Sequence, residues 1–392
     1  MAMHAPDAVA APPLATAPAV PLSLADRLLM LRDRLYASRA FHRFASTYAP
    51  WRWITRVRSR QVFDLVGGFV YTQVITTCFA VDLFRLLDGG PQDEATIARH
   101  TGLGDEGTRR LLRAAASLRL VSTRSRGRWG LGPLGGPLVH DRALARMVAH
   151  NQHFYRDLAD PSAILRKARG ETELSRFWSY GAAERPHEID PLTAAEFSGI
   201  MADTIPPLAE DVLDHYDMGR HRVLMDVGGG EGLFLAAAAR RHPTLRVQLF
   251  DLPAVVARAQ ARFEREGLAD RAQVHGGDFH RDALPTGADV ITLVRVLLDH
   301  GDDRAQALVR AAKAALPPGG ALLVAEPFAG QRNTGPLADA YFGLYLWAMG
   351  QGRARTEAEH RGMLEAAGFT RIRRLPTRTP LWTDLLVAYN DD

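Results

Sequence analysis

A glycine-rich turn between a predicted strand and a predicted helix is the clearest chemical feature of the 392-residue sequence. The apolar residues 223–227 predict a buried strand, and the apolar spacing over 233–241 predicts a helix. Gly228, Gly229 and Gly230 stand between them. Glycines at this point permit a tight turn and let a ligand approach the backbone closely. Taken alone, the turn indicates a nucleotide-like ligand.

Residues after the next two predicted strands favour S-adenosylmethionine over NAD as that ligand. Asp251 ends the next strand about 20 residues on, where a carboxylate can accept hydrogen bonds from both ribose hydroxyls. Asp278 and Phe279 follow the third strand, where an acid can bind the adenine amino group and a ring can stack on the base. The glycine spacing also differs from the usual dinucleotide fingerprint. The sequence therefore predicts an S-adenosylmethionine site, with NAD as the alternative.

Strands alternate with helices throughout residues 216–392, which predicts a Rossmann-like α/β domain around a mainly parallel, doubly wound sheet. Five strands are expected, at 223–227, 246–251, 272–275, 288–293 and 321–326. Ligands of such sheets bind beyond the carboxyl ends of the strands. The cofactor residues are expected at that edge.

The chain before this domain divides into four predicted parts. They are a disordered Ala- and Pro-rich leader at 1–22, a basic aromatic helical arm at 23–60, a mostly helical winged-helix domain at 61–140, and a helical linker at 141–215 that contributes to an acceptor pocket. A winged helix can serve dimerisation or DNA binding. Because a complete cofactor signature follows it, dimerisation is favoured. A winged-helix DNA-binding regulator that senses a ligand is the alternative from a different class.

The arm at 23–60 combines basic side chains with aromatic ones. Its arginines are Arg27, Arg32, Arg34, Arg39, Arg43, Arg52, Arg56, Arg58 and Arg60. We expect the arm to pack on a partner subunit or to meet anionic lipid head groups. The whole chain carries a net charge of only +4, so no nucleic-acid partner is expected. No uninterrupted apolar run of about 18 residues occurs, which predicts no membrane span. The single cysteine, Cys78, favours a reducing, cytoplasmic location, with peripheral contact to the inner membrane as a further option.

These motifs resemble the plant-type small-molecule O-methyltransferases, the caffeate and acetylserotonin methyltransferase group, over roughly residues 60–390. The motifs are Asp226-Val227-Gly228-Gly229-Gly230-Glu231-Gly232, Asp251-Leu252-Pro253, Gly277-Asp278-Phe279, Leu316-Pro317-Pro318-Gly319-Gly320, Arg355-Thr356 and Ala367-Gly368-Phe369. The resemblance implies a homodimer and a cofactor site lined by Gly228, Gly229, Gly230, Asp251, Asp278, Phe279 and Arg295. No metal site is predicted.

The usual general base of that family is missing. The family reads His-Asp-Trp after the fourth strand, whereas this chain reads Leu298-Asp299-His300. Either His300 acts as the base from a shifted position, or methyl transfer depends on proximity and alignment alone. Glu326 ends the fifth strand and resembles the glutamate that orients the family's histidine, or else it only caps the strand. The family's second such glutamate would fall close to Ala354.

The acceptor pocket is expected to draw on the middle helices and on the apolar segment 341–349. Its candidate residues are His150, Met201, Tyr345 and Met349. Together the apolar side chains of the segment suggest a long hydrophobic acceptor.

Within the family, residues 63–71, residues 295–300 and the arm are most similar to the carotenoid hydroxyl O-methyltransferases of purple photosynthetic bacteria. That similarity implies methylation of a hydroxylated carotenoid of the spheroidene type, as a step of carotenoid biosynthesis for photosynthesis. A bacteriochlorophyll-ring methyltransferase and an aromatic phenol or polyketide methyltransferase are the alternatives.

Overall fold

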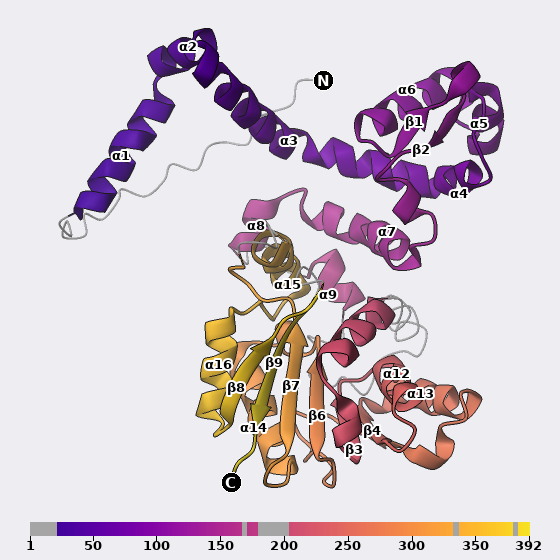
Figure 1. Cartoon of the computed structure of the whole chain (residues 1–392), viewed down its shortest axis with the longest axis vertical. Coiled ribbons are helices and arrows are strands. Elements are labelled where there is room, and N and C mark those ends of the chain that lie inside the picture. Colours follow the sequence, from indigo (N-terminus) through magenta and orange to yellow (C-terminus); the bar gives the residue numbers. More distant parts are fainter. Residues whose placement is uncertain (1–21, 167–170, 179–203, 332–336, 379–382) are drawn as a thin grey trace. The chain divides into compact units, whose positions relative to one another are not determined.

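A computed structural model describes residues 22–166, 171–178, 204–331, 337–378 and 383–392 (Figure 1). The chain divides into two compact units, Met1–Thr77 and Cys78–Asp392. The predicted leader, apart from its last residue, and the candidate pocket residue Met201 lie outside the described residues.

The described part of the first unit is helical. It contains α1 (Leu24–Ala37), α2 (Arg39–Thr47) and most of α3 (Ala49–Ala80). The Ser23 hydroxyl caps α1 by accepting the Asp26 N–H, and the Ser38 hydroxyl caps α2 by accepting the Phe41 N–H. These caps begin two separate helices within the basic arm.

The long helix α3 bears on the prediction of no membrane span. By length and composition alone, Pro50–Ala80 is long and apolar enough to cross a membrane, and an 18-residue window within it has a mean hydropathy of 1.4. Gly, Thr and Gln residues interrupt the apolar run without lowering the average of this window much. The same test is passed by helices of soluble proteins. The absence of a membrane span therefore stays a prediction.

The second unit begins with the predicted winged helix. It consists of α4 (Leu83–Asp88), α5 (Glu94–Thr101), α6 (Gly104–Ser117) and the strands β1 (Val121–Thr123) and β2 (Trp129–Leu131). The two strands pair antiparallel, with Val121 opposite Leu131. Helices α7 (Arg142–Asp157), α8 (Pro161–Leu165) and α9 (Glu173–Phe177) follow, and residues 204–215 are helical.

A seven-stranded sheet in the order β5-β4-β3-β6-β7-β9-β8 confirms the predicted α/β class. The five predicted strands are β3 (Val223–Val227), β4 (Arg246–Asp251), β5 (Ala272–Gly276), β6 (Val290–Val294) and β7 (Ala321–Glu326), and they pair in parallel. Two strands were not predicted. These are β8 (Thr370–Leu375) and β9 (Asp384–Tyr389), which extend the sheet antiparallel beyond β7.

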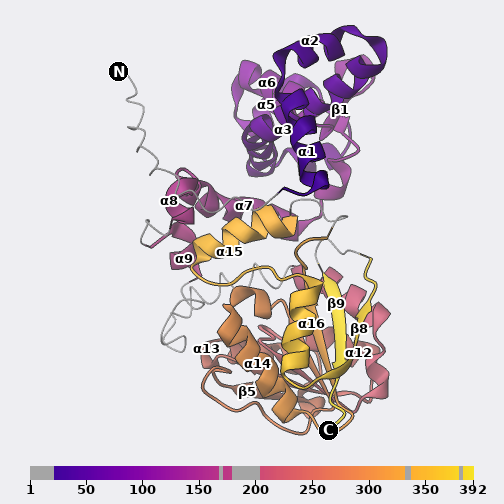
Figure 2. The ribbon, with the colours of Figure 1, turned by 90° about the vertical axis from the view of Figure 1, so that its left-hand side faces the viewer.

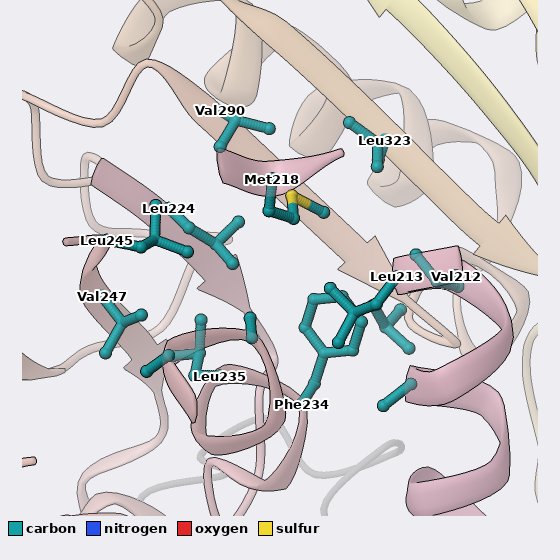
Figure 3. Close-up of a cluster of buried hydrophobic side chains, with 14 of the residues drawn as sticks. Val212, Leu213, Met218, Leu224, Phe234, Leu235, Leu245, Val247, Val290 and Leu323 are labelled. Carbon is teal, nitrogen blue, oxygen red and sulfur yellow. The ribbon is translucent and has the colours of Figure 1, made fainter. Parts of the chain in front are cut away.

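Helices cover both faces of this sheet (Figure 2). On one face α12 (Leu233–Arg241), α13 (Pro253–Arg265) and the helix at 204–215 bury a core that includes Phe234, Leu224 and Val290 (Figure 3). On the other face α14 (Asp302–Ala315) and α16 (Glu357–Ala366) bury a second core. Helix α15 (Gly343–Met349) belongs to neither, because its buried residues pack with α7, α8 and α9.

Candidate active site

The glycine turn lies where β3 ends, beside the end of β4. The Gly230 N–H donates a 2.7 Å hydrogen bond to one carboxylate oxygen of Asp251, and the Leu252 N–H donates to the other at 2.7 Å. Gly228 and Gly230 have φ angles of 71° and 57°, the left-handed region that favours glycine. No heavy atom lies within 4 Å of the point where a Gly230 Cβ would stand. The turn therefore leaves an open backbone surface next to a fixed carboxylate.

Asp226 supports this turn from within the sheet. It is buried at the end of β3, and the Thr292 hydroxyl donates a 2.7 Å hydrogen bond to it. Burial raises the pKa of Asp226 to about 7. A Cβ on Gly229 would lie 2.8 Å from the second carboxylate oxygen of Asp226. The middle glycine is therefore required by packing, and Asp226 positions the turn.

The loop after β5 carries the predicted adenine-binding pair, and His300 packs against it. The Asp278 carboxylate accepts the N–H of His280 at 2.9 Å, which fixes the loop. The His300 ring is edge-on to Phe279, with the centroids 5.3 Å apart, and to His280 at 4.9 Å. Burial, and then the neighbouring His280, Arg304 and Arg355, lower the pKa of His300 to about 3. His300 is thus a neutral imidazole grouped with the cofactor residues.

The loop after β6 is held by two buried side chains, Glu326 and Arg355. One oxygen of Glu326 accepts the N–H groups of Val296 and Leu298, each at 3.1 Å. The guanidinium of Arg355 donates to the carbonyls of Leu297 and His300, each at 2.7 Å. The second oxygen of Glu326 lies 3.6 Å from Nε2 of His360. Glu326 therefore contacts the loop backbone, and the histidine nearest its carboxylate is on α16.

Leu298 and His300 lie in different surroundings, although only one residue separates them. Leu298 lies within a 3₁₀ turn, Leu297–Asp299, and His300 follows directly after it. Successive side chains of such a turn point in different directions. Leu298 is buried in a cluster with Trp178, Tyr345 and Met349, whereas His300 contacts Phe279 and His280. The position of the family's base thus contacts the acceptor candidates, and the histidine contacts the cofactor loop.

Three of the four predicted acceptor residues come together in that cluster. His150 Nε2 and the Tyr345 hydroxyl are 2.6 Å apart, and Met349 is buried with Tyr345. Trp178 Nε1 donates to the Tyr345 oxygen at 2.6 Å. Burial lowers the pKa of His150 to about 4, which keeps the ring neutral. The tautomer of this ring decides which group donates in the contact with Tyr345.

Arg295, the last predicted cofactor residue, follows the end of β6 with a φ of 55°. Its guanidinium donates a 2.7 Å hydrogen bond to the Thr204 hydroxyl on the helix at 204–215. Trp178 and Arg355 were not assigned roles from the sequence. Arg355 belongs to the motif Arg355-Thr356, but only the structure shows that it is buried and that it binds the backbone of the loop after β6.

Comparison with known proteins is consistent with this geometry. An O-methyltransferase domain matches residues 155–370, and an O-methyltransferase dimerisation domain matches residues 63–141. Demethylspheroidene O-methyltransferase of Cereibacter sphaeroides is 40% identical over 363 residues, covering 92% of this chain and 95% of that protein. Acetylserotonin O-methyltransferase of Mus musculus is 34% identical, covering 82% of this chain and 86% of the mouse enzyme. The apo structure of the S-adenosylmethionine-dependent methyltransferase SibL superposes with a TM-score of 0.71 at 25% identity, covering 85% and 99% of the two chains.

The chain belongs to the O-methyltransferase family. The predicted fold, the enzyme class and S-adenosylmethionine as the cofactor are thereby confirmed, and the DNA-binding regulator is not favoured. The matched dimerisation domain supports the expected homodimer. The open surface at Gly230, together with Asp251 and Phe279 at the neighbouring strand ends, fits the cofactor.

The role of Glu326 predicts a particular pH dependence. Burial raises the pKa of Glu326 to about 7, so folding favours its protonated form. Its contribution to stability is complete below the unfolded pKa of about 4.3 and is lost as the pH rises through 7. Between about pH 5 and 8 the unfolding free energy of the wild type should therefore fall, through this group, by roughly 3 kcal/mol at most. We expect Glu326→Gln to remove this fall, because glutamine does not titrate. Urea unfolding at several pH values measures this.

Glu326→Ala leaves two buried N–H groups without an acceptor and is expected to cost about 2 to 4 kcal/mol. Glu365→Gln, at an exposed position of α16, is the matched control. It should change neither the unfolding free energy nor the dependence of that free energy on pH. A glutamine variant as unstable as the alanine variant would refute the proposed contact with the loop backbone.

Proposed function

We propose that this O-methyltransferase methylates a hydroxyl group of a carotenoid of the spheroidene type. The observation that carries the proposal is the 40% identity to demethylspheroidene O-methyltransferase, which extends over 92% of this chain. The buried cluster of Phe154, Leu298, Leu346 and Met349 supports it, because these apolar side chains suit a hydrocarbon acceptor. A bacteriochlorophyll ring or an aromatic phenol as acceptor is not favoured by these relatives.

S-adenosylmethionine, when bound, supplies an electrophilic methyl group on its sulfonium. Gly228, Gly229 and Gly230 offer their backbone to the cofactor, Asp251 is suited to the ribose hydroxyls, and Asp278 with Phe279 to the adenine. Leu298 and the aromatic side chains around it offer the acceptor an apolar surface. Holding the two reactants in line converts a bimolecular step into one that is effectively unimolecular.

We favour alignment over general-base catalysis as the main contribution of the protein. Leu298 has no group that accepts a proton. Nε2 of His150 is already engaged with the Tyr345 hydroxyl at 2.6 Å, and a group with a pKa of about 4 is poorly matched to proton removal near pH 7. His300, the alternative base, faces Phe279 and His280, and a group with a pKa of about 3 is poorly matched to proton removal near pH 7. The hydroxyl proton passes to solvent water as the methyl group is transferred.

Peripheral contact with the inner membrane follows from the same proposal. A carotenoid partitions into the hydrocarbon region of a bilayer, so a soluble enzyme has to meet its acceptor at the membrane surface. The matched dimerisation domain covers residues 63–141 and so begins after the arm. The basic arm before it remains as the candidate for membrane contact.

The acceptor is testable with purified enzyme. With labelled S-adenosylmethionine, the protein is expected to transfer label to a hydroxylated carotenoid dissolved in detergent, and the product mass should increase by one methylene group. Catechol and flavonoid acceptors are the matched comparison, because they suit the phenol-methylating relatives. Turnover of these phenols without turnover of the carotenoid would contradict the proposal.

The absence of a base is testable at His300. Removing a ring that packs on Phe279 should weaken the adenine site, so His300→Ala is expected to raise KM for S-adenosylmethionine about tenfold while kcat at saturation stays within about twofold. His140→Ala, at an exposed position, is the control. A loss of about 100-fold or more in kcat with unchanged KM would establish His300 as the base instead.

A further inference from the structure

The charge of the chain is concentrated in one segment. Residues 23–60 contain nine arginines and two aspartates, a net charge of +7. Because the whole chain carries +4, the remaining residues carry −3. The basic excess is therefore a property of the arm and not of the enzyme as a whole.

Helix α1 carries an uncovered leucine stripe. Leu24, Leu28, Leu31 and Leu35 follow one another at spacings of four, three and four, which places them on one face of a helix. Their exposed fractions are 79%, 68%, 65% and 47%, and no residue of α1 is buried. Among the described residues of the first unit, nothing covers this stripe, and an apolar stripe of this kind favours a covering surface.

The charges of α1 are arranged around that stripe by sign. At about 100° per residue, Arg27 and Arg34 lie roughly 70° to 90° to one side of the stripe centre, and Arg32 lies about 70° to the other. Asp26 and Asp33 lie about 170° away, on the opposite face. Arginine stems beside an apolar stripe let the guanidinium groups reach lipid phosphates, while the acids point away from them.

Aromatic side chains continue this pattern into α2 and the first turns of α3. Tyr48, Trp51 and Trp53 are exposed, with Trp53 at 71%. Tryptophan and tyrosine favour the boundary between head groups and hydrocarbon. Arg43 and Arg52, in the same segment, are exposed and have no acidic partner within the described residues. Free guanidinium groups in one segment with exposed indole rings suit an anionic lipid surface.

A second copy of this chain fits the arm less well. The arm ends before residue 63, where the matched dimerisation domain begins. In a symmetric dimer the same patch meets itself, and the stripe of one α1 would bring its flanking arginines against those of the other. Anionic lipid supplies both an apolar layer for the leucines and a negative layer for the arginines.

We propose that α1, with the start of α3, docks the enzyme on bilayers that contain anionic phospholipid, with the leucine stripe in the outer hydrocarbon. This proposal rests on the proposed function in one respect only: a lipid-dissolved acceptor explains why the enzyme would dock on a bilayer. Binding to vesicles without any carotenoid tests it independently of the acceptor's identity.

Co-sedimentation of the full-length enzyme measures this binding, with vesicles of phosphatidylcholine alone or mixed with phosphatidylglycerol. We expect binding to the anionic vesicles that weakens with added salt. Arg27→Gln/Arg34→Gln should reduce it about thirtyfold, given the attraction of each basic residue to an anionic surface. Leu28→Asn/Leu31→Asn should reduce it at least about tenfold.

The matched control is Leu29→Asn/Met30→Asn, which changes the same number of apolar residues of α1 off the stripe. This variant should bind as the wild type does. Equal loss in both double variants, no preference for anionic vesicles, or a change in oligomer mass for the stripe variant would overturn the proposal. All variants should methylate an acceptor presented in detergent, so that a failure of lipid docking is distinguishable from a failure of the enzyme.

Discussion

Parallel strand pairing is the constraint on which the site depends. Because β3, β4, β5, β6 and β7 run in one direction, the loops after them meet at one edge of the sheet. The Asp251 carboxylate can then accept the N–H of Gly230, 21 residues earlier in the chain. Val296, after β6, reaches the same turn, since a Cβ on Gly228 would lie 2.8 Å from its side chain. One sheet edge thus assembles the cofactor surface from separate loops.

The loop after β6 carries the residues in which this chain differs from the family's usual motif. Glu326 and Arg355 hold its backbone from two sides through four hydrogen bonds. With the backbone fixed, Leu298 lies in the acceptor cluster and His300 lies against the cofactor loop. Leu298 is buried there among apolar side chains. The same geometry moves the nearby histidine into cofactor packing.

Much of the fold was predictable because its signals are local. An apolar strand followed by glycines or an acid identifies β3 with its turn, and β4 with Asp251, within a few residues. Strand β8 was not predicted because Arg371, Arg373 and Arg374 interrupt its apolar character at the sheet edge. The hydrogen bond from Trp178 to Tyr345 joins residues 167 positions apart, so no local pattern could indicate it. Likewise, a fully buried Arg355 is visible only once both loops are placed.

Binding of S-adenosylmethionine to variants at the end of β4 tests the central claim most directly. Calorimetric titration of Asp251→Ala should give a dissociation constant at least about tenfold higher than that of the wild type, because a charged hydrogen-bond acceptor is removed from the glycine turn and the ribose. Asp270→Ala, an exposed acid just before β5, should bind within about twofold of the wild type. Equal affinity of the two variants would contradict a cofactor site built on the contact between Asp251 and Gly230.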